Sequence, residues 1–156
     1  MKKRDIYGYL IGIAAAELVG LLVRLFSGAG DAFYSGLNQP PLAPPGWVFP
    51  VAWAILYALM GAASYQIWES TAENRRGALV LYAAQLAVNF AWTIVFFRFR
   101  LIGPAVAVLV LLCVLAALTM AQFRKIRRSA GLLLLPYMLW LLFALYLNAG
   151  VWLLNP

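Results

Sequence analysis

The chain has 156 residues, of which 65% are hydrophobic and 11% charged, with a net charge of +7 and a mean hydropathy of +0.87. This composition excludes an ordinary soluble domain and indicates an integral membrane protein. Lys and Arg lie at the ends of apolar segments, where lipid headgroups account for them, so we expect no nucleic-acid partner. The sequence has no His and a single Cys, so we expect no metal site and see no conventional catalytic constellation.

Five apolar segments are long enough to cross a hydrocarbon core of about 30 Å, which takes about 20 helical residues. They span approximately residues 6–26, 47–68, 77–97, 102–123 and 132–154. We therefore predict an all-α integral membrane protein, a five-helix transmembrane bundle that forms a single domain over residues 1–156. Basic residues, including Lys2, Arg76 and Arg124, concentrate at one set of span ends. The positive-inside rule then predicts a cytoplasmic N-terminus and a C-terminus outside.

The first span carries small residues at every fourth position: Gly8, Gly12, Ala16 and Gly20. Such a stripe lets helices approach closely, either within the bundle or across a dimer seam, and both alternatives stay open. Glu17 and Arg24 share another face. Ionisable groups within a span tend to face the protein interior, so they form an ion pair or lie at a cavity edge. Arg24 can also extend outward to the headgroups.

A proline-rich loop precedes the second span. Pro40, Pro41, Pro44 and Pro45 stiffen it and exclude helix, so the helix begins near Trp47 and accommodates Pro50 in its first turn. A helical step of about 100° then gathers one face of the helix: Trp53, Tyr57, Gly61, Ser64 and Trp68. We interpret the loop as a lid and this face as the wall of a binding cavity.

The remaining spans differ in their faces. The third has one polar and aromatic face, made of Gln85, Asn89, Trp92 and Phe96, and an opposite face of Ala84, Ala87 and Ala91. The polar face should look into the bundle, for a ligand or for hydrogen bonds between helices, and the alanine face can pack on another helix or subunit. The fourth span is almost wholly apolar and is predicted to be a lipid-facing scaffold. The fifth carries Tyr137, Trp140, Ala144 and Asn148 on one side, and Pro136 is expected to kink or open it.

If the faces of the second, third and fifth spans converge, they enclose an aromatic pocket suited to a flat lipophilic ligand. An aromatic core without a ligand explains the same pattern equally well. No His is available to ligate a haem iron, so a metal-free porphyrin, or haem held by shape, fits such a pocket better than a strongly ligated haem.

Three segments carry a family resemblance: YSGLNQPPLAPPGWVFPVAWAILYALMG (34–61), LYAAQLAVNFAWTIVFF (81–97) and LLPYMLWLLFALYLN (134–148). In this order they resemble the TspO family, the tryptophan-rich sensory proteins related to the mitochondrial translocator protein, and the resemblance covers essentially the whole chain. It implies a five-helix bundle in a bacterial cell membrane, commonly dimeric through small-residue helix faces. It also implies a pocket beneath the first loop that binds porphyrins and benzodiazepine-type ligands.

The resemblance further implies roles for individual residues. Trp53 and Trp140 match paired tryptophans implicated in light-dependent breakdown of protoporphyrin, so they are the catalytic candidates. Adding the faces above gives the predicted ligand-binding set: Trp47, Trp53, Tyr57, Gln85, Asn89, Phe90, Trp92, Tyr137, Trp140, Ala144 and Asn148. Protoporphyrin IX or haem is then a ligand, and we expect no cofactor. Leu42 departs from the family, since many relatives have Trp there, and Ala149 and Leu153 replace the Tyr and basic residue of the animal sterol motif.

Three functional hypotheses follow. The first is a membrane receptor or translocator for porphyrin-type tetrapyrroles. The second, from a different class, is a light- and oxygen-dependent protoporphyrin-degrading protein that uses its paired Trp residues. The third is a structural or regulatory membrane partner that acts through its glycine and alanine faces.

Overall fold

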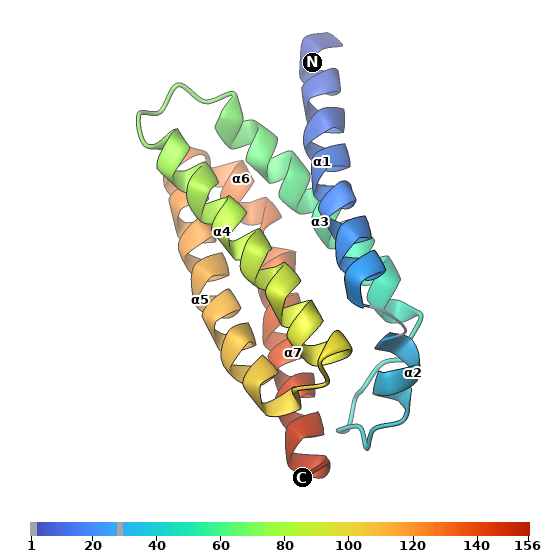
Figure 1. Cartoon of the computed structure of the whole chain (residues 1–156). Coiled ribbons are helices and arrows are strands. Elements are labelled where there is room, and N and C mark those ends of the chain that lie inside the picture. The colour runs from blue at the N-terminus through green and yellow to red at the C-terminus, as the bar shows by residue number, and fades with distance from the viewer. Residues whose placement is uncertain (1–2, 28–29) are drawn as a thin grey trace.

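The computed structural model of the protein describes residues 3–27 and 30–156, so Lys2 lies outside the described residues. Five helical spans, all long and apolar enough to cross a membrane, form one bundle, which confirms the predicted fold class (Figure 1). The elements are α1 (Lys3–Ser27), α2 (Gly30–Ser35), α3 (Val48–Trp68), α4 (Arg75–Thr93), η1 (Ile94–Arg98), α5 (Ile102–Ile126), α6 (Arg128–Leu133) and α7 (Leu135–Leu154). One end of the bundle carries the N-terminus and α6, and the other carries α2 and the C-terminus.

The close approach of α1 to α3 decides between the two alternatives for the glycine stripe. A Cβ atom on Gly12 would lie 2.7 Å from the carbonyl oxygen of Gly61, and one on Gly20 would lie 2.6 Å from the Tyr57 ring. Only glycine leaves room for this contact, because the two backbones nearly touch. The stripe therefore packs within the bundle. It is not a free dimer seam.

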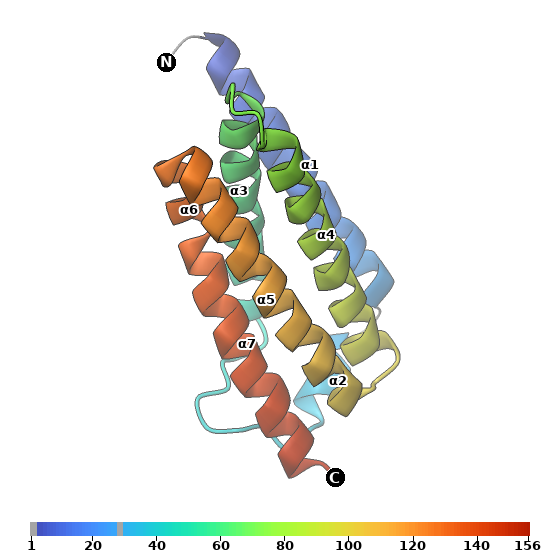
Figure 2. The ribbon, with the colours of Figure 1, turned by 90° about the vertical axis from the view of Figure 1, so that its left-hand side faces the viewer.

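The fourth span is more central than predicted. Helix α5 lies between α4 and α7 (Figure 2), and Ala105, Leu109, Leu112 and Phe123 on its inner face are fully buried. The expectation of a lipid-facing scaffold was wrong for this face, although Val110 and Val114 on the outer face are about half exposed. A helix that is apolar all round looks the same in sequence whether lipid or other helices surround it, because lipid tails are as apolar as leucine.

Two spans change their helical geometry along their length. The fifth is interrupted at Leu134, between α6 and α7, and Pro136 occupies the first turn of α7, which confirms the predicted break. The third ends in the π-helical turn η1, where Phe99 N donates to Ile94 O at 3.0 Å. The π turn was not predicted. Such turns shift the direction of the side chains that follow them and often lie at functional sites.

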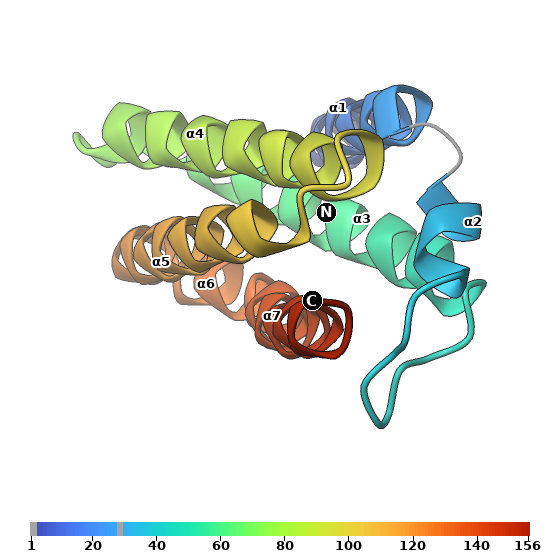
Figure 3. The ribbon, with the colours of Figure 1, turned by 60° about the horizontal axis from the view of Figure 1, so that its bottom comes forward.

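The loop that follows α2 is tied to the C-terminal end of α7. Asn38 N donates to Asn155 Oδ1 at 3.0 Å, Asn155 Nδ2 donates back to Asn38 O at 2.9 Å, and the Tyr146 hydroxyl donates to Pro41 O at 2.7 Å. Figure 3 brings this end forward and shows the loop as a long excursion between α2 and the start of α3. The helix starts at Val48, one residue after the predicted position, whereas α2 lies in a segment where no helix was predicted.

The glycine seam gives a stability prediction. Replacing Gly12 with Ala forces α1 and α3 apart, because the new Cβ would overlap the Gly61 carbonyl, and we expect a loss of about 1–3 kcal/mol. Gly77→Ala is the matched control, since a Cβ there meets nothing within 4 Å, and it should be neutral or stabilising by up to about 1 kcal/mol. Thermal unfolding of both variants in detergent measures the difference. Equal melting temperatures for the two variants would contradict the close packing of α1 on α3 at Gly12.

Candidate ligand-binding cavity

A cavity of about 580 Å³ lies inside the bundle beneath the proline-rich loop. This volume falls within the range of about 300–1,000 Å³ typical of small-molecule sites. Helix α1 contributes one wall, α3 and α4 with η1 contribute the next two, and the outer half of α7 closes the fourth side. The roof comes from α2 and the loop, through Tyr34, Ser35, Gln39, Pro44, Pro45 and Gly46.

The α3 and α4 walls are aromatic. The ring centroid of Trp53 lies 5.6 Å from that of Tyr57 and 6.5 Å from that of Trp92, and Trp92 lies 6.0 Å from Phe96. Both Phe96 and its neighbour Phe97, within the π turn, line the cavity. Aromatic faces at these separations offer a flat ligand a surface on which to stack.

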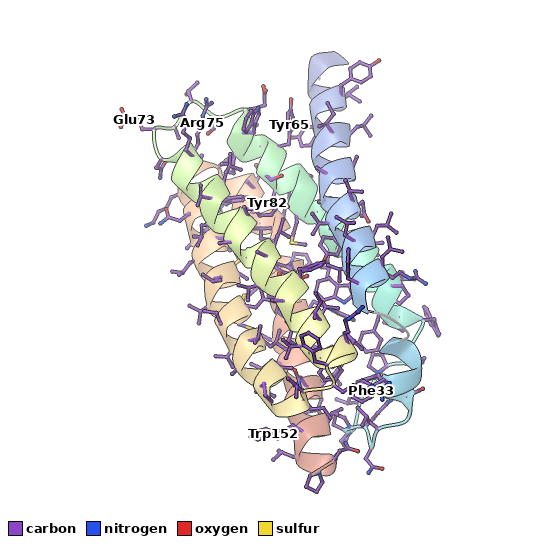
Figure 4. All side chains as sticks on the ribbon, viewed as in Figure 1. Phe33, Tyr65, Glu73, Arg75, Tyr82 and Trp152 are labelled. Carbon is purple, nitrogen blue, oxygen red and sulfur yellow. The ribbon has the colours of Figure 1, made fainter. Side chains whose placement is uncertain are left out.

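Helix α2 places a second aromatic cluster over this wall. The Tyr34 ring lies 5.4 Å from Phe49 and 6.3 Å from Phe96, while Phe33 lies 6.0 Å from Phe96. The guanidinium of Arg100 sits 5.3 Å from the centre of the Phe33 ring, a cation–π contact that joins α2 to the turn before α5. Figure 4 shows Phe33 at this end of the bundle, at the level of the loop.

Buried hydrogen bonds fix the polar side chains of the cavity. The Tyr57 hydroxyl donates to Asn89 Oδ1 at 2.8 Å, which joins α3 to α4. Trp92 Nε1 donates to Asn148 Oδ1 at 3.1 Å, and Asn148 Nδ2 donates to the Ile102 carbonyl at 3.1 Å, which joins α4, α7 and the start of α5. The first two bonds are buried, so the loss of either would leave a buried polar group without a partner.

Two buried polar atoms on the cavity wall have no hydrogen-bond partner in the described part of the chain: Asn89 Nδ2 and the Tyr34 hydroxyl oxygen. A buried donor left unpaired costs about 1–3 kcal/mol, so such groups are rare in finished cores. Burial raises the pKa of the Tyr34 hydroxyl above its ordinary value, so it keeps its proton at neutral pH. Both atoms can therefore donate to a ligand in the cavity.

The structure places six of the predicted site residues on the cavity wall: Trp53, Tyr57, Asn89, Trp92, Ala144 and Asn148. Gln85 and Tyr137 are buried behind the wall, where the Tyr137 hydroxyl donates to Gln85 Oε1 at 2.7 Å. This pair follows the alternative in which third-span amides serve hydrogen bonding between helices. The Tyr137 ring supports Trp53 from behind, with centroids 6.3 Å apart.

Three further predicted residues do not reach the cavity. Trp47 is 69% exposed, and Phe90 packs edge-on to Phe26 of α1, with ring centroids 5.8 Å apart. Trp140 lies on the surface of the bundle where α3 meets α7, beside a shallow apolar groove. Its ring centroid is 6.0 Å from that of Phe49. Phe49 stands between Trp140 and the cavity, so the predicted pair of Trp53 and Trp140 does not share one wall. Trp68, assigned to the Trp53 face, is also 67% exposed.

Several cavity residues were missed by the sequence analysis. Phe49 precedes Trp53 by four residues and Thr93 follows Asn89 by four, so extending the same helical faces would have found both. Tyr34 and Phe97 carried no such signal, because one lies on α2 in the loop region and the other in the π turn. The interpretation of Glu17 and Arg24 as cavity-edge groups agrees with the structure, since both line the cavity.

A five-helix membrane protein with an aromatic cavity beneath a proline-rich loop is the class that this fold and site define. Residues 12–153 match the TspO/MBR family. The chain is 41% identical to a tryptophan-rich sensory protein of Cereibacter sphaeroides over 147 residues, covering 94% of this chain and 89% of the relative. It is 41% identical to a translocator protein of Ovis aries over 128 residues (80% and 76%), and 37% identical to protein CrtK of Rhodobacter capsulatus over 150 residues (95% and 91%). The chain belongs to the TspO/MBR family, which confirms the resemblance.

Proposed function

We propose that the protein is a membrane receptor or translocator that binds porphyrin-type tetrapyrroles, and other flat lipophilic ligands, in the cavity beneath the loop. The observation that carries the proposal is the aromatic wall of Trp53 and Trp92 facing a cavity of about 580 Å³. The names of the relatives, translocator protein and tryptophan-rich sensory protein, agree with binding or passage of a small molecule.

The cavity chemistry supports a flat ligand with polar substituents. A macrocycle can stack against the indoles while the unpaired Asn89 Nδ2 and Tyr34 hydroxyl donate to its oxygen atoms. Cys113 lies on α5 and does not line the cavity, and the sequence has no His. Among the described residues no cluster of metal-ligating side chains is present. A metal-free porphyrin therefore suits the cavity better than a haem held through its iron.

Titration of the purified protein with protoporphyrin IX, followed by Trp fluorescence, tests the proposal. Trp53→Ala should weaken binding about tenfold or more, because a stacked aromatic partner and its buried area are lost. Trp140→Ala should change the affinity less than twofold, since Phe49 separates that ring from the cavity. Trp68→Ala, on the exposed face of α3, is the control for loss of one fluorophore. Unchanged affinity in Trp53→Ala would rule out this cavity.

A second candidate function is light- and oxygen-dependent degradation of the bound porphyrin. The observation that favours it is the proximity of Trp53 and Trp92, whose rings lie 6.5 Å apart on the cavity wall. In such a reaction excited porphyrin activates dioxygen, which adds across one bridging carbon–carbon bond and opens it to two carbonyl groups. Both oxygen atoms come from dioxygen, so no further reductant is required. The indoles would guide the oxidation in place of a conventional catalytic group.

Illumination of the complex, with the porphyrin absorption band as readout, tests this function. Trp53→Phe and Trp92→Phe should each slow the light-dependent loss several-fold at saturating porphyrin, whereas Trp140→Phe should not. A dark sample and an oxygen-free sample are the controls, and both should keep the band. Equal rates in all variants would make the protein a passive host for the pigment.

The third proposal concerns the oligomeric state. The glycine face of α1 is occupied by α3, but Ala84, Ala87 and Ala91 on α4 remain exposed and form a smooth surface. We propose that a homodimer forms through this α4 face, because small residues let helices approach closely in lipid. Ala87→Leu should shift the protein toward monomer in chemical cross-linking and light-scattering measurements. Val114→Leu, on the exposed face of α5, is the control, and a dimer that survives Ala87→Leu would remove this face from the interface.

We propose a bacterial cell membrane as the location of the protein. The arrangement of its basic residues supports one orientation across that membrane. The α3–α4 turn and the α5–α6 turn lie at the end that carries the N-terminus, and Figure 4 shows Glu73 and Arg75 there, opposite Phe33 and Trp152. Arg75, Arg76, Arg124, Lys125, Arg127 and Arg128 belong to these turns or border them, against Arg98 and Arg100 at the other end. This bias supports a cytoplasmic N-terminus and a cavity mouth on the outer side.

A further inference from the structure

Helix α1 lines the cavity with two ionisable side chains at different depths. Glu17 stands near the middle of the 21-residue span Ile6–Phe26, and Arg24 stands close to its loop-side end. The seven residues between them correspond to about 10 Å along the helix axis. The wall therefore presents a carboxylate near the midplane of the membrane and a guanidinium near the mouth.

Glu17 lies at a depth in the membrane where a carboxylate needs a hydrogen-bond donor or a cation beside it. A charge in the middle of a span is costly, and such groups face the protein interior and pair with a donor or a cation. On the described wall beside it, Gly20 and Leu21 are apolar, the Tyr57 hydroxyl gives its proton to Asn89 Oδ1, and Asn89 Nδ2 is a donor that a ligand can share with Glu17. Arg24 stands two helical turns nearer the mouth, so the two charged groups line the cavity at different depths.

We propose that Glu17 is a specificity-determining residue that selects flat ligands bringing a protonated amine or another N–H donor to the midplane depth of the cavity. Arg24 takes an acidic substituent of the same ligand near the mouth. The preferred ligand is an aromatic amphiphile with a basic nitrogen at one end. This inference rests on the proposed function of the same cavity and adds a chemical preference to it.

A set of porphyrins that share one macrocycle tests the preference. Protoporphyrin IX carries two carboxylates, its dimethyl ester is neutral, and its diamide with two aminoethyl groups is cationic at pH 7. Affinities come from quenching of Trp fluorescence in a neutral detergent. We expect the wild-type protein to bind the diamine about tenfold more tightly than the ester. Glu17→Gln, which keeps the size of the side chain, should abolish this ratio by weakening the binding of the diamine.

Two further variants assign the effect. Glu73→Gln is the matched control, because it removes a carboxylate in the α3–α4 turn outside the cavity, and it should keep the wild-type preference. Arg24→Gln should lower the affinity for protoporphyrin IX several-fold relative to its ester and should not change the diamine-to-ester ratio. Thermal unfolding of each variant in detergent, with a melting temperature close to that of the wild type, shows that the fold is intact.

The outcomes separate the inference from the proposed function. If the ester binds but the diamine preference is absent, or survives in Glu17→Gln, the assignment to Glu17 is overturned while porphyrin binding stands. If none of the three porphyrins binds the wild-type protein, the proposed function itself fails. A preference lost in Glu17→Gln and kept in Glu73→Gln supports the inference.

Discussion

The contact between Gly12 of α1 and Gly61 of α3 is the constraint on which the cavity depends. Helix α1 packs mainly against α3 and leaves most of its other surface to lipid, so its position follows from one seam. Lipid tails give no hydrophobic drive for two helices to associate, so close backbone contact must hold them together. Because the seam fixes the rotation of α1, it also fixes which of its side chains line the cavity. Glu17 and Arg24 face inward for this reason.

Buried side-chain hydrogen bonds hold the remaining walls at the spacing that leaves the cavity open. The Tyr57–Asn89 bond joins α3 to α4 and the Trp92–Asn148 bond joins α4 to α7, and Asn148 continues the connection to the start of α5. Behind them, the Tyr137–Gln85 bond anchors the floor. In an interior without water each bond resists separation strongly. The polar groups pair across the helices, and among the buried side-chain atoms of the described residues only Asn89 Nδ2 and the Tyr34 hydroxyl are left unpaired.

Helical periodicity predicted the parts of this arrangement in which polar and apolar residues alternate. On the third span it found the buried face with Gln85, Asn89 and Trp92, since each polar residue there must turn inward. It did not predict the central place of α5, because an all-apolar helix carries no facial contrast. The prediction that Trp140 points into the cavity was wrong for another reason. Phe49, in the first turn of α3, contacts the Trp140 ring and lines the cavity, whereas Trp140 does not. A contact between two helices that are far apart in the chain leaves no trace in either helix's own sequence.

The loop also explains why the departure at Leu42 leaves the cavity wall unchanged. Leu42 has φ 68°, in the left-handed region that L residues avoid, and its side chain is 83% exposed. A strained residue of this kind costs on the order of 1–2 kcal/mol and persists only where its neighbours are held. Here Asn155 holds Asn38 and Tyr146 holds Pro41, both just before Leu42 in the chain. Since Pro44, Pro45 and Gly46 form the roof while residue 42 points outward, replacing a tryptophan there changes the outer surface of the loop, and the stacking surface for a ligand remains that of Trp53 and Trp92.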